Sequence, residues 1–496
     1  MANLNQAQTR AELFEKLRSG VVGLEVHYKL ATGETTRRIY LDSTASTLRL
    51  QVVQDVLDKF QPFYSNTHSV LHFGAKLSTH EYECAHQMAL DFVHADAGTY
   101  TAFFVGSGTT GGINRVARTL HAKRPERDVV ITSIMEHHSN DLPHRKHFRE
   151  VVHVPARMAA HSLGCIDLKR IEEALHEYKG RVNYIALTGV ANVTGIINPI
   201  HEAAELAHRF GALIVVDAAQ MAAHVPIQMS GHANAWRDLD VVVFSGHKIY
   251  APGSPGVVVA RKEIFSNLEP DEVGGGMVDT VYVNRYTVTP HFPHREEAGT
   301  PNIIGAIGLA AALYALQKVG MDYIAEEETE LINYALKKLS RVPDILIYGE
   351  TDVAHCQRTG AISFNIKRLH HAFTAAVLND YFNISVRNEC FCAHPYVREM
   401  VTQSLAEEAL ELSDEELQYL ADLHKGMVRA SFGVYNTKDD VDALAAALHD
   451  LSTPRDFYQQ HYVQLPNGDY RHKTFRFDHA ALFSVKGVVD QVLTVG

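Results

Sequence analysis

The sequence predicts an α/β protein in which a large domain with a mostly parallel sheet is followed by a smaller α+β domain. From about residue 40 to residue 300, short β-branched runs alternate with longer segments of helical periodicity, the pattern of strand–helix–strand units. Several of these runs end in clusters of small and polar residues, as expected where parallel strands reach a ligand site. After about residue 330 this rhythm changes, which indicates a separate α+β unit.

The composition narrows the classes of function. The chain has 496 residues, 46% of them hydrophobic and 21% charged, which is ordinary for a globular protein with a large core. A net charge of −12 disfavours nucleic acid and anionic membranes as partners, because both require clustered Lys and Arg. Five cysteines do not make a disulfide framework, and neither an export signal nor a membrane span is expected. We therefore expect a cytoplasmic protein that acts on small molecules or proteins.

The first forty residues predict a small N-terminal unit. Thr9 and Glu12 have the spacing of a capping box, which predicts a helix that begins there and ends at Gly20. Residues 22–40 alternate apolar and polar side chains around Thr32-Gly33, which predicts a hairpin.

Five strand candidates in the large domain share one feature, because each runs into residues capable of chemistry. Ligands bind outside the carboxyl ends of the strands in open α/β sheets, so the five clusters are expected to converge on one site. The strands and their clusters are Thr101–Val105 with Gly106–Gly112, Val129–Ile134 with Glu136–Asn140, Tyr184–Thr188 with Asn192–Gly195, Leu213–Val216 with Asp217–Gln220, and Val241–Phe244 with Ser245–Lys248.

The remainder of the chain predicts a connection, a small domain and an extension. Ile303–Tyr323, rich in Ala and Leu and free of Pro, predicts a long helix that bridges two domains. Ser413–Glu416 and Thr437–Asp440 each open a predicted helix, and Met427–Phe432 is a predicted strand between them. Pro466–Gly468 predicts the turn of an appended hairpin before a final helix. We divide the chain into an N-terminal helix and hairpin (1–39), a large cofactor-binding domain (40–300), a bridging helix (301–330), a small C-terminal domain (331–453) and a C-terminal extension (454–496).

Lys248 follows the last of the five strands. The run Val241–Phe244 predicts a buried strand, so Lys248 is expected at the mouth of the sheet and partly desolvated. A desolvated amine loses its proton readily and can form a Schiff base with a carbonyl group. Most lysines in loops are solvent-exposed and inert, so the other clusters decide whether this one is chemical.

The glycine-rich segment Gly106–Gly111 offers a phosphate site. Its three glycines match the dinucleotide pattern, but such a fingerprint should open the domain, and this one arrives after roughly a hundred residues. Interpreted as a helix N-terminus with free amides and two threonine hydroxyls, it suits a single phosphate. A loop that is only flexible is the alternative.

Asp217 completes the case for a cofactor. A carboxylate at a strand end usually caps a helix, but it can also keep a heterocyclic nitrogen protonated. An Asp beside a pyridine ring, together with a lysine Schiff base, is the pairing that an enzyme dependent on pyridoxal 5′-phosphate requires. The residues predicted to hold the phosphate are Gly108, Thr109 and Thr110, with Ser245 and His247 assisting.

The histidines raise the alternative of a metal site. His137, His138, His144 and His147 lie close in sequence, and Cys390, Cys392 and His394 alternate with other residues. Neither group has a complete zinc-ligand spacing, and the chain contains 30 histidines, so chance clusters are common. We predict no metal, and an imidazole stacked on the cofactor ring instead.

These motifs, in this order, resemble the cysteine desulfurase and selenocysteine lyase family (group II-like) among the class V aminotransferases, which are fold-type I enzymes that depend on pyridoxal phosphate. The resemblance runs from about Tyr40 to Leu448. The matching segments are Tyr40–Ser43, Gly108–Thr110, Glu136–Asn140, Asn192–Gly195, Asp217–Gln220, Ser245–Lys248, Ala298–Asn302, Val386-Arg387, Cys392–Pro395 and Val428–Ser431.

The resemblance implies roles for individual residues. His137 would stack on the cofactor ring, and Asn192 and Gln220 would contact the cofactor near its phenolic oxygen. Thr300 would reach the phosphate of a neighbouring subunit, which implies a homodimer. Cys392 would be the nucleophile. The substrate-binding residues would be Arg429, Arg387 and Ala45, with the Arg429 guanidinium on the substrate carboxylate.

We therefore expect a cysteine desulfurase that converts L-cysteine to L-alanine and leaves a persulfide on Cys392, with selenocysteine as a possible substrate and a protein as a possible sulfur acceptor. Cys390, two residues before Cys392, departs from the family pattern and leaves the nucleophile open. The alternatives are a class V enzyme without a nucleophilic thiol, such as a carbon–sulfur lyase, a kynureninase-like hydrolase or an epimerase. A nicotinamide-dependent oxidoreductase and a non-catalytic scaffold are more distant alternatives.

Overall fold

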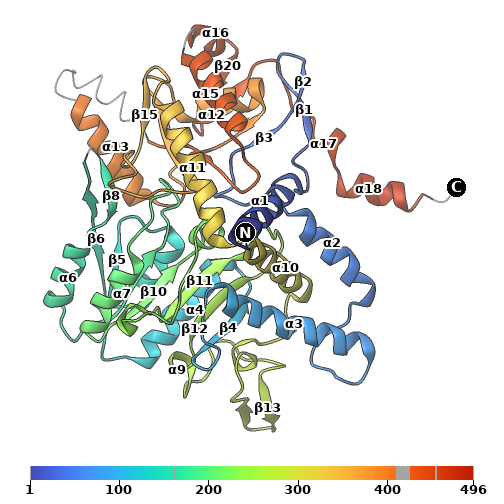
Figure 1. The fold of residues 1–496 in the computed structure, drawn as a ribbon, viewed down its shortest axis with the longest axis vertical. Coiled ribbons are helices and arrows are strands. Elements are labelled where there is room, and N and C mark those ends of the chain that lie inside the picture. The colour runs from blue at the N-terminus through green and yellow to red at the C-terminus, as the bar shows by residue number, and fades with distance from the viewer. Residues whose placement is uncertain (1, 161, 409–424, 453–454, 495–496) are drawn as a thin grey trace.

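A seven-stranded sheet forms the centre of the larger part of the molecule (Figure 1). The computed structural model describes residues 2–160, 162–408, 425–452 and 455–494. Neighbouring strands run parallel except where β12 pairs antiparallel with β4 and β11, so the predicted mostly parallel sheet is confirmed. In sheet order, the strands are β4 (Tyr100–Val105), β12 (Gly256–Arg261), β11 (Val241–Ser245), β10 (Leu213–Asp217), β9 (Val182–Thr188), β5 (Val129–Ser133) and β6 (Glu150–Val154).

Both faces of this sheet are buried, which explains why its strands are continuous apolar runs. Along β11, Val242 and Phe244 belong to the core on one face, and Val241 and Val243 to the core on the other. Helix α4 covers the second face, and α3, α7 and α10 contribute to the first. The helices of this part are α2 (Gln51–Phe60), α3 (Phe73–Phe92), α4 (Gly108–Lys123), α5 (Leu142–His147), α6 (Leu168–Glu177), α7 (Ile200–Arg209), α8 (Met221–His224), α9 (Lys262–Phe265) and α10 (Ile303–Val319).

The N-terminal unit follows the prediction except at its start. Helix α1 (Ala2–Ser19) ends before Gly20 as expected, and β1 (His27–Lys29) pairs with β2 (Thr35–Arg37) in the predicted hairpin. The predicted helix start at Thr9 is wrong, because the helix already begins at Ala2 and Glu12 accepts a hydrogen bond from Gln8. Phe14 is buried and packs edge-on against Tyr323, so α1 is docked on the body of the protein.

Two helices replace the predicted single helix Ile303–Tyr323. Helix α10 ends at Val319, and α11 (Met321–Leu339) leaves it at 79°. Gly320, with φ of +99°, forms the bend in a backbone conformation that L side chains rarely adopt. Helix α10 packs on α2 and α3, whereas α11 packs on α15 of the smaller part. In the described ranges, no single helix is long and apolar enough to cross a membrane; only this bent pair passes such a test, by length and composition.

A four-stranded antiparallel sheet forms the smaller part, which has its own hydrophobic core. Strand β19 confirms the predicted strand Met427–Phe432, and α15 begins at the predicted capping segment near Thr437. The predicted helix opened by Ser413–Glu416 lies outside the described residues. The elements are β15 (Ile345–Ile347), β16 (Ala361–Ile366), β19 (Met427–Ser431), β18 (Arg387–Glu389), α12 (His371–Phe382), α13 (His394–Glu408) and α15 (Lys438–Ser452).

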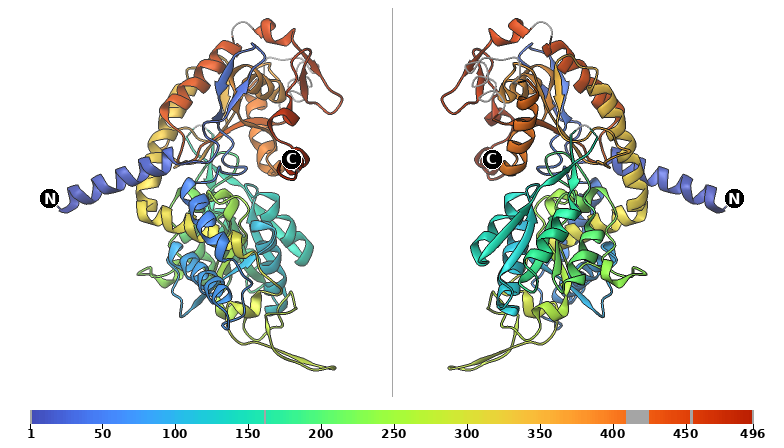
Figure 2. Two further views of the ribbon diagram at one scale, coloured as in Figure 1. Left: turned by 90° about the vertical axis from the view of Figure 1, so that its right-hand side faces the viewer. Right: turned by 90° about the vertical axis from the view of Figure 1, so that its left-hand side faces the viewer.

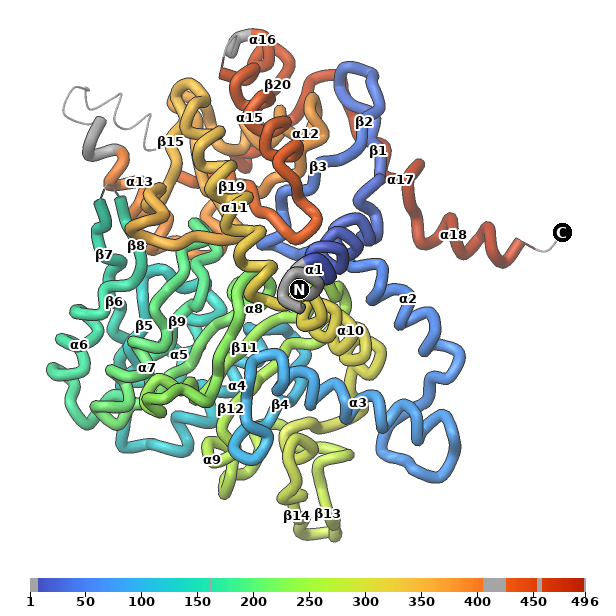
Figure 3. Tube along the Cα trace, viewed as in Figure 1, coloured from blue at the N-terminus to red at the C-terminus, as the bar shows by residue number. Residues whose placement is uncertain are grey.

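Short pairs of strands and a tail complete the chain. The tail contains the predicted hairpin and final helix, and α18 runs away from the body to the C-terminus (Figure 3). The hairpin β13–β14 projects from the far end of the large part (Figure 2). These elements are β3 (Ile39–Tyr40) with β17 (Ile384–Ser385), β7 (Ala156–Met158) with β8 (Leu163–Ile166), β13 (Val278–Val281) with β14 (Tyr286–Val288), α16 (Arg455–Gln459), β20 (Tyr462–Gln464) with β21 (Tyr470–His472), α17 (His479–Leu482) and α18 (Val485–Val492).

Gly195 should be one of the least replaceable residues of the fold. Its φ is +73°, and an added Cβ would overlap the carbonyl oxygen of Thr359 and lie 2.7 Å from that of Ala361. We expect Gly195→Ala to lower the free energy of unfolding by about 3 kcal/mol or more. Gly180 also has positive φ but open space around it, so Gly180→Ala should cost only about 1 kcal/mol. Denaturant unfolding of the two variants measures the difference, and equal costs would contradict the close packing at Gly195.

Candidate active site

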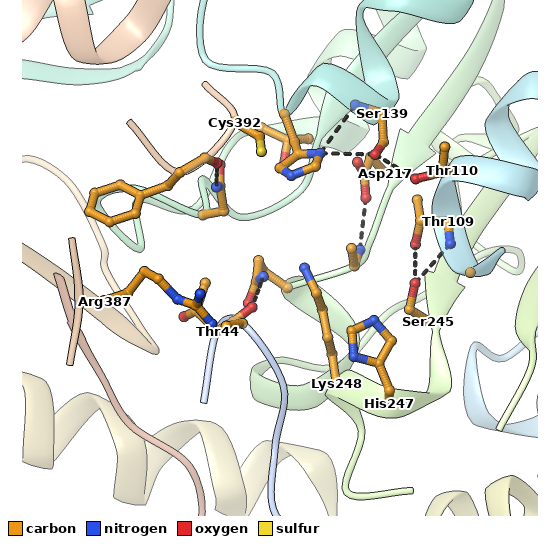
Figure 4. A pocket seen from close by; sticks show the side chains of 18 of the residues that line it. Thr44, Thr109, Thr110, Ser139, Asp217, Ser245, His247, Lys248, Arg387 and Cys392 are labelled. Atoms are coloured by element: carbon orange, nitrogen blue, oxygen red, sulfur yellow. Dashed lines mark hydrogen bonds between the residues drawn. The ribbon is translucent and has the colours of Figure 1, made fainter. Parts of the chain in front are cut away.

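The predicted clusters at the strand ends line a single cavity of about 610 Å³ (Figure 4). Loops after β4, β5, β9, β10 and β11 form one side of the cavity. The segment before α13 and strand β19 of the smaller part form the other side, so the cavity lies between the two hydrophobic cores. Its size is that of a site for a cofactor-sized molecule.

Lys248 points its amine into this cavity from the short turn after β11 (Figure 4). The pKa of the amine is lowered to about 8, chiefly by burial; the carboxylate of Asp217 opposes this shift and the charge of Arg429 adds to it. A sizeable fraction of the amine is therefore neutral near physiological pH, as nucleophilic attack on a carbonyl requires.

Asp217 ends β10, the strand next to β11. Its Oδ1 accepts a hydrogen bond of 2.9 Å from the amide of Ala219. Burial raises the pKa of this carboxyl, and the Ala219 amide and Lys248 lower it. Among the described residues Oδ2 has no hydrogen-bond donor, although the side chain lines the cavity. A protonated ring nitrogen in the cavity would satisfy this oxygen and stabilise the carboxylate.

The start of α4 forms a polar cradle at one end of the cavity. Thr109 donates to Ser245 Oγ from its amide over 2.7 Å, and its hydroxyl lies 2.8 Å from the same oxygen. Gly108 has φ of +60°, and a Cβ there would lie 2.7 Å from Ser245 Oγ. The Thr110 hydroxyl hydrogen-bonds that of Ser139 over 2.7 Å. First-turn amides of a helix together with hydroxyl groups suit a phosphate, so the residues present fit pyridoxal phosphate.

His137 is held as a neutral ring at the cavity wall. Burial, followed by the charge of Lys248, lowers its pKa to about 4. Nδ1 accepts a hydrogen bond of 3.1 Å from the amide of Ser139, which leaves the proton on Nε2. A neutral imidazole fixed in this way can stack on an aromatic ring without placing a second positive charge beside Lys248.

Cys392 belongs to a constrained loop between β18 and α13. Phe391 and Cys392 have φ of 50° and 55°, an uncommon conformation for residues with side chains. Two hydrogen bonds from the large part hold them: Asn192 Nδ2 donates to the carbonyl of Phe391 (2.8 Å), and the amide of His138 donates to that of Cys392 (2.7 Å). The exposed thiol of Cys392 is thereby kept at the cavity, which it lines.

Cys390 occupies a different environment. Its thiol donates to the carbonyl of Lys425 over 3.1 Å, and burial raises its pKa. It does not contribute to the cavity lining. Since the thiolate is the nucleophilic form, this environment favours Cys392 over Cys390 as the reactive thiol.

Two arginines face the cavity from the smaller part. Arg429 is buried, its Nη1 donates to the carbonyl of Asn192 (2.9 Å), and its guanidinium lies 4.5 Å from the ring centre of Phe391. Burial lowers its pKa to about 10, and its Nε has no hydrogen-bond partner within the described part of the chain. Arg387 is exposed and donates to Asp42 Oδ2 over 2.9 Å.

The remaining predicted site residues divide into two groups. Ala45 and Gln220 line the cavity, and Gln220 Nε2 donates to the carbonyl of Thr44 (2.9 Å). Thr300 is exposed and lies outside the cavity lining of its own chain. Among the described residues, no group of three or more His, Cys, Asp or Glu side chains is arranged to hold a metal ion.

Sequence reasoning gave no role to several residues of the site. Asp42 binds Arg387 and lies 3.7 Å from Arg429, which places a carboxylate between the two arginines. Ser139 and Phe391 stand inside motifs that were noted for neighbouring residues. A site role for Ser139 could have been predicted from its position two residues after His137. No role could have been predicted for Asp42, because its partners lie hundreds of residues away in the chain.

Comparison with known proteins identifies the family. A family model described as aminotransferase class-V matches residues 39–444, most of the chain. The chain belongs to the class-V aminotransferase family.

Class-V relatives share most of their length with this chain. A probable cysteine desulfurase of Halalkalibacterium halodurans is 34% identical over 83% of this chain and 92% of its own. A cysteine desulfurase of Klebsiella pneumoniae is 34% identical over 83% of this chain and 93% of its own. Among solved structures, the apo cysteine desulfurase of Thermococcus onnurineus has a TM-score of 0.70 and 29% identity, and covers 84% of this chain and 94% of its own. The predicted fold and family are thereby confirmed.

Glu136, buried behind His137, gives the site a pH-dependent stability. Burial raises its pKa from 4.5 to about 8, against hydrogen bonds from Ser133 and Asn140. Its folded-state pKa lies above the unfolded one, so its contribution is complete below about pH 4.5 and is lost as pH rises through 8.

We expect Glu136→Gln to remove a slope of about 1.4 kcal/mol per pH unit from the unfolding free energy between about pH 5 and 8. Denaturant unfolding at several pH values measures this slope. Glu177, exposed on α6, is the control, and Glu177→Gln should leave the slope unchanged. An unchanged slope in Glu136→Gln would mean that Glu136 is ionised in the folded protein.

Proposed function

We propose that this protein is a cysteine desulfurase that depends on pyridoxal phosphate and converts L-cysteine to L-alanine with transfer of the sulfur to Cys392. The observation that carries this proposal is that Lys248, Asp217 and the Cys392 thiol all line one cavity. The relatives named as cysteine desulfurases support it. Selenocysteine, with selenium in place of sulfur, suits the same arrangement of groups.

Each part of the proposed cofactor has matching protein groups. The amides and hydroxyls of Gly108, Thr109 and Thr110 would hold the phosphate, with Ser245 and His247 beside them. Asp217 would keep the ring nitrogen protonated, while the side chains of His137, Asn192 and Gln220 would flank the ring. When bound, pyridoxal phosphate supplies a positively charged ring that stabilises negative charge at the substrate Cα.

Lys248 and the arginines act on the substrate. The Lys248 amine, a sizeable fraction of which is neutral because of its lowered pKa, can first hold the cofactor and then move the proton at the substrate Cα. Arg429, with Arg387 nearer the opening, provides a planar donor group for the substrate carboxylate. Ala45 leaves room beside this carboxylate.

Cys392 takes the sulfur. Its thiolate attacks the sulfur of the substrate, a sulfur–sulfur bond forms, and the substrate carbon–sulfur bond breaks. The electron pair of the broken bond stays on carbon, which takes up a proton to give alanine. The products are alanine and a Cys392 persulfide, so no external oxidant or reductant is needed for this half of the cycle.

Further expectations concern assembly and setting. Thr300 is exposed, and Glu297, three residues before it, accepts hydrogen bonds from Tyr82, His86 and the amide of Phe104. The proposal includes a homodimer in which the exposed Thr300 reaches the phosphate of the neighbouring site. A protein sulfur acceptor and a cytoplasmic location accord with an exposed Cys392 and its need for a reduced thiol.

Lys248→Ala should abolish covalent attachment of the cofactor. Borohydride reduction of the purified protein fixes the bond between cofactor and lysine, and mass spectrometry of the peptides checks which lysine carries it. We expect Lys248 to be labelled in the parent and in Lys169→Ala, an exposed control on α6. Labelling of another lysine in the parent would overturn the assignment.

Cys392→Ala should separate the proposed function from its rivals. We expect alanine formation from cysteine to fall at least about a hundredfold, because the sulfur loses its acceptor. Cys390→Ala should retain activity within about threefold. Full activity of Cys392→Ala would favour a class-V enzyme without a thiol nucleophile, such as a carbon–sulfur lyase, a kynureninase-like hydrolase or an epimerase. Loss of activity only in Cys390→Ala would exchange the roles of the two thiols.

A further inference from the structure

A pair of histidines joins the two segments that bring His137 and Cys392 to the cavity. His138 follows His137 after β5, and His394 is the first residue of α13, two positions after Cys392. The distance between His138 Nε2 and His394 Nδ1 is 2.9 Å. Their rings are nearly parallel, at 7°, with centres 4.8 Å apart. Because one nitrogen must accept this hydrogen bond, at least one of the two imidazoles has to be neutral.

The pair lies next to a strained segment of backbone. The left-handed conformations of Phe391 and Cys392 persist only if surrounding contacts fix them. The amide of His138 already holds the carbonyl of Cys392, and the side chain of the same residue holds His394. His138 therefore hydrogen-bonds the residues on both sides of Ala393, whereas His137 beside it faces the cavity.

The protonation of the two imidazoles depends on the charged groups around them. Burial lowers the pKa of His138, and the charges of His394 and Arg145 lower it further, whereas Asp141 raises it. Asp141 pairs with Arg145 and with His153, His137 precedes His138 in the chain, and Arg398 lies one helical turn after His394 on α13. A pair in which both imidazoles are cationic, with a proton on every ring nitrogen, cannot keep its hydrogen bond and is mutually repulsive.

We propose that the His138–His394 pair is a positioning latch for Cys392, closed when at least one imidazole is neutral and open when both are protonated. The latch holds the thiol at the cavity at neutral pH and releases the segment Glu389–Val397 in acid. His138 and His394 act through the backbone of Cys392 and not on the substrate. The proposal rests on the proposed function in one respect: positioning Cys392 matters for catalysis only if Cys392 is the nucleophile.

Hydrogen exchange of the holoenzyme tests the latch without any turnover. Amide exchange in peptides covering Glu389–Val397 is measured from pH 5 to pH 8 and corrected for the intrinsic rate. In the parent we expect about fivefold faster corrected exchange at pH 5 than at pH 8, the effect of one typical hydrogen bond. His394→Ala should exchange at the faster rate throughout. His394→Asn, whose amide can replace Nδ1 and does not titrate, should remain slow throughout.

The variants also separate this proposal from the proposed function. His449→Ala, at an exposed histidine of α15, is the control and should behave as the parent. An acid step that is absent from the parent, or retained in His394→Asn, would overturn the latch, as would fast exchange of His394→Asn at pH 8. If alanine formation is measured as well, His394→Ala should lower kcat several-fold with little change in KM. A protein that shows the expected exchange but makes no alanine would refute the proposed function and leave the latch standing.

Discussion

Burial of the Lys248 amine beside the carboxylate of Asp217 is the constraint on which the rest of the site depends. Asp217 ends β10, Lys248 lies in the short turn after the neighbouring parallel strand β11, and the register of the two strands pairs Asp217 with Val243. A charged group is costly in a low-dielectric cavity unless it has a partner of opposite charge. Burial accordingly lowers the pKa of the lysine and raises the pKa of the aspartate. A carbonyl group for the amine and a cationic ring for the carboxylate would relieve both. The glycines and hydroxyls at the start of α4 then provide for the anion that such a ligand carries.

The smaller part completes this site through contacts that cross between the two cores. Asn192, on a loop of the large part, donates to the carbonyl of Phe391 and accepts from Arg429, so one side chain and its backbone hold both the thiol-bearing loop and the buried arginine. The bend at Gly320 lets α10 pack on the large part and α11 on the small one. The position of Cys392 is therefore a property of the joint between the two parts and not of its own strand or helix.

Much of this arrangement could be predicted from the sequence, because it is encoded in short segments. Apolar runs identified the five strands, and the polar clusters after them identified the cavity and Lys248. The prediction failed where local signals compete: the capping-box spacing at Thr9 lies inside α1, and the apolar run from Ile303 hid a glycine bend. Asp42 and the His138–His394 pair could not be found, since their partners are hundreds of residues apart and only the folded chain brings them together.

The most direct test of the account is the location of the sulfur after reaction with cysteine. The holoenzyme is treated with L-cysteine in the absence of a reductant, trapped with an alkylating reagent and mapped by mass spectrometry of its peptides. The account predicts one additional sulfur atom on Cys392, formed together with alanine. Alanine formed with the additional sulfur on Cys390, or on no cysteine at all, would contradict it.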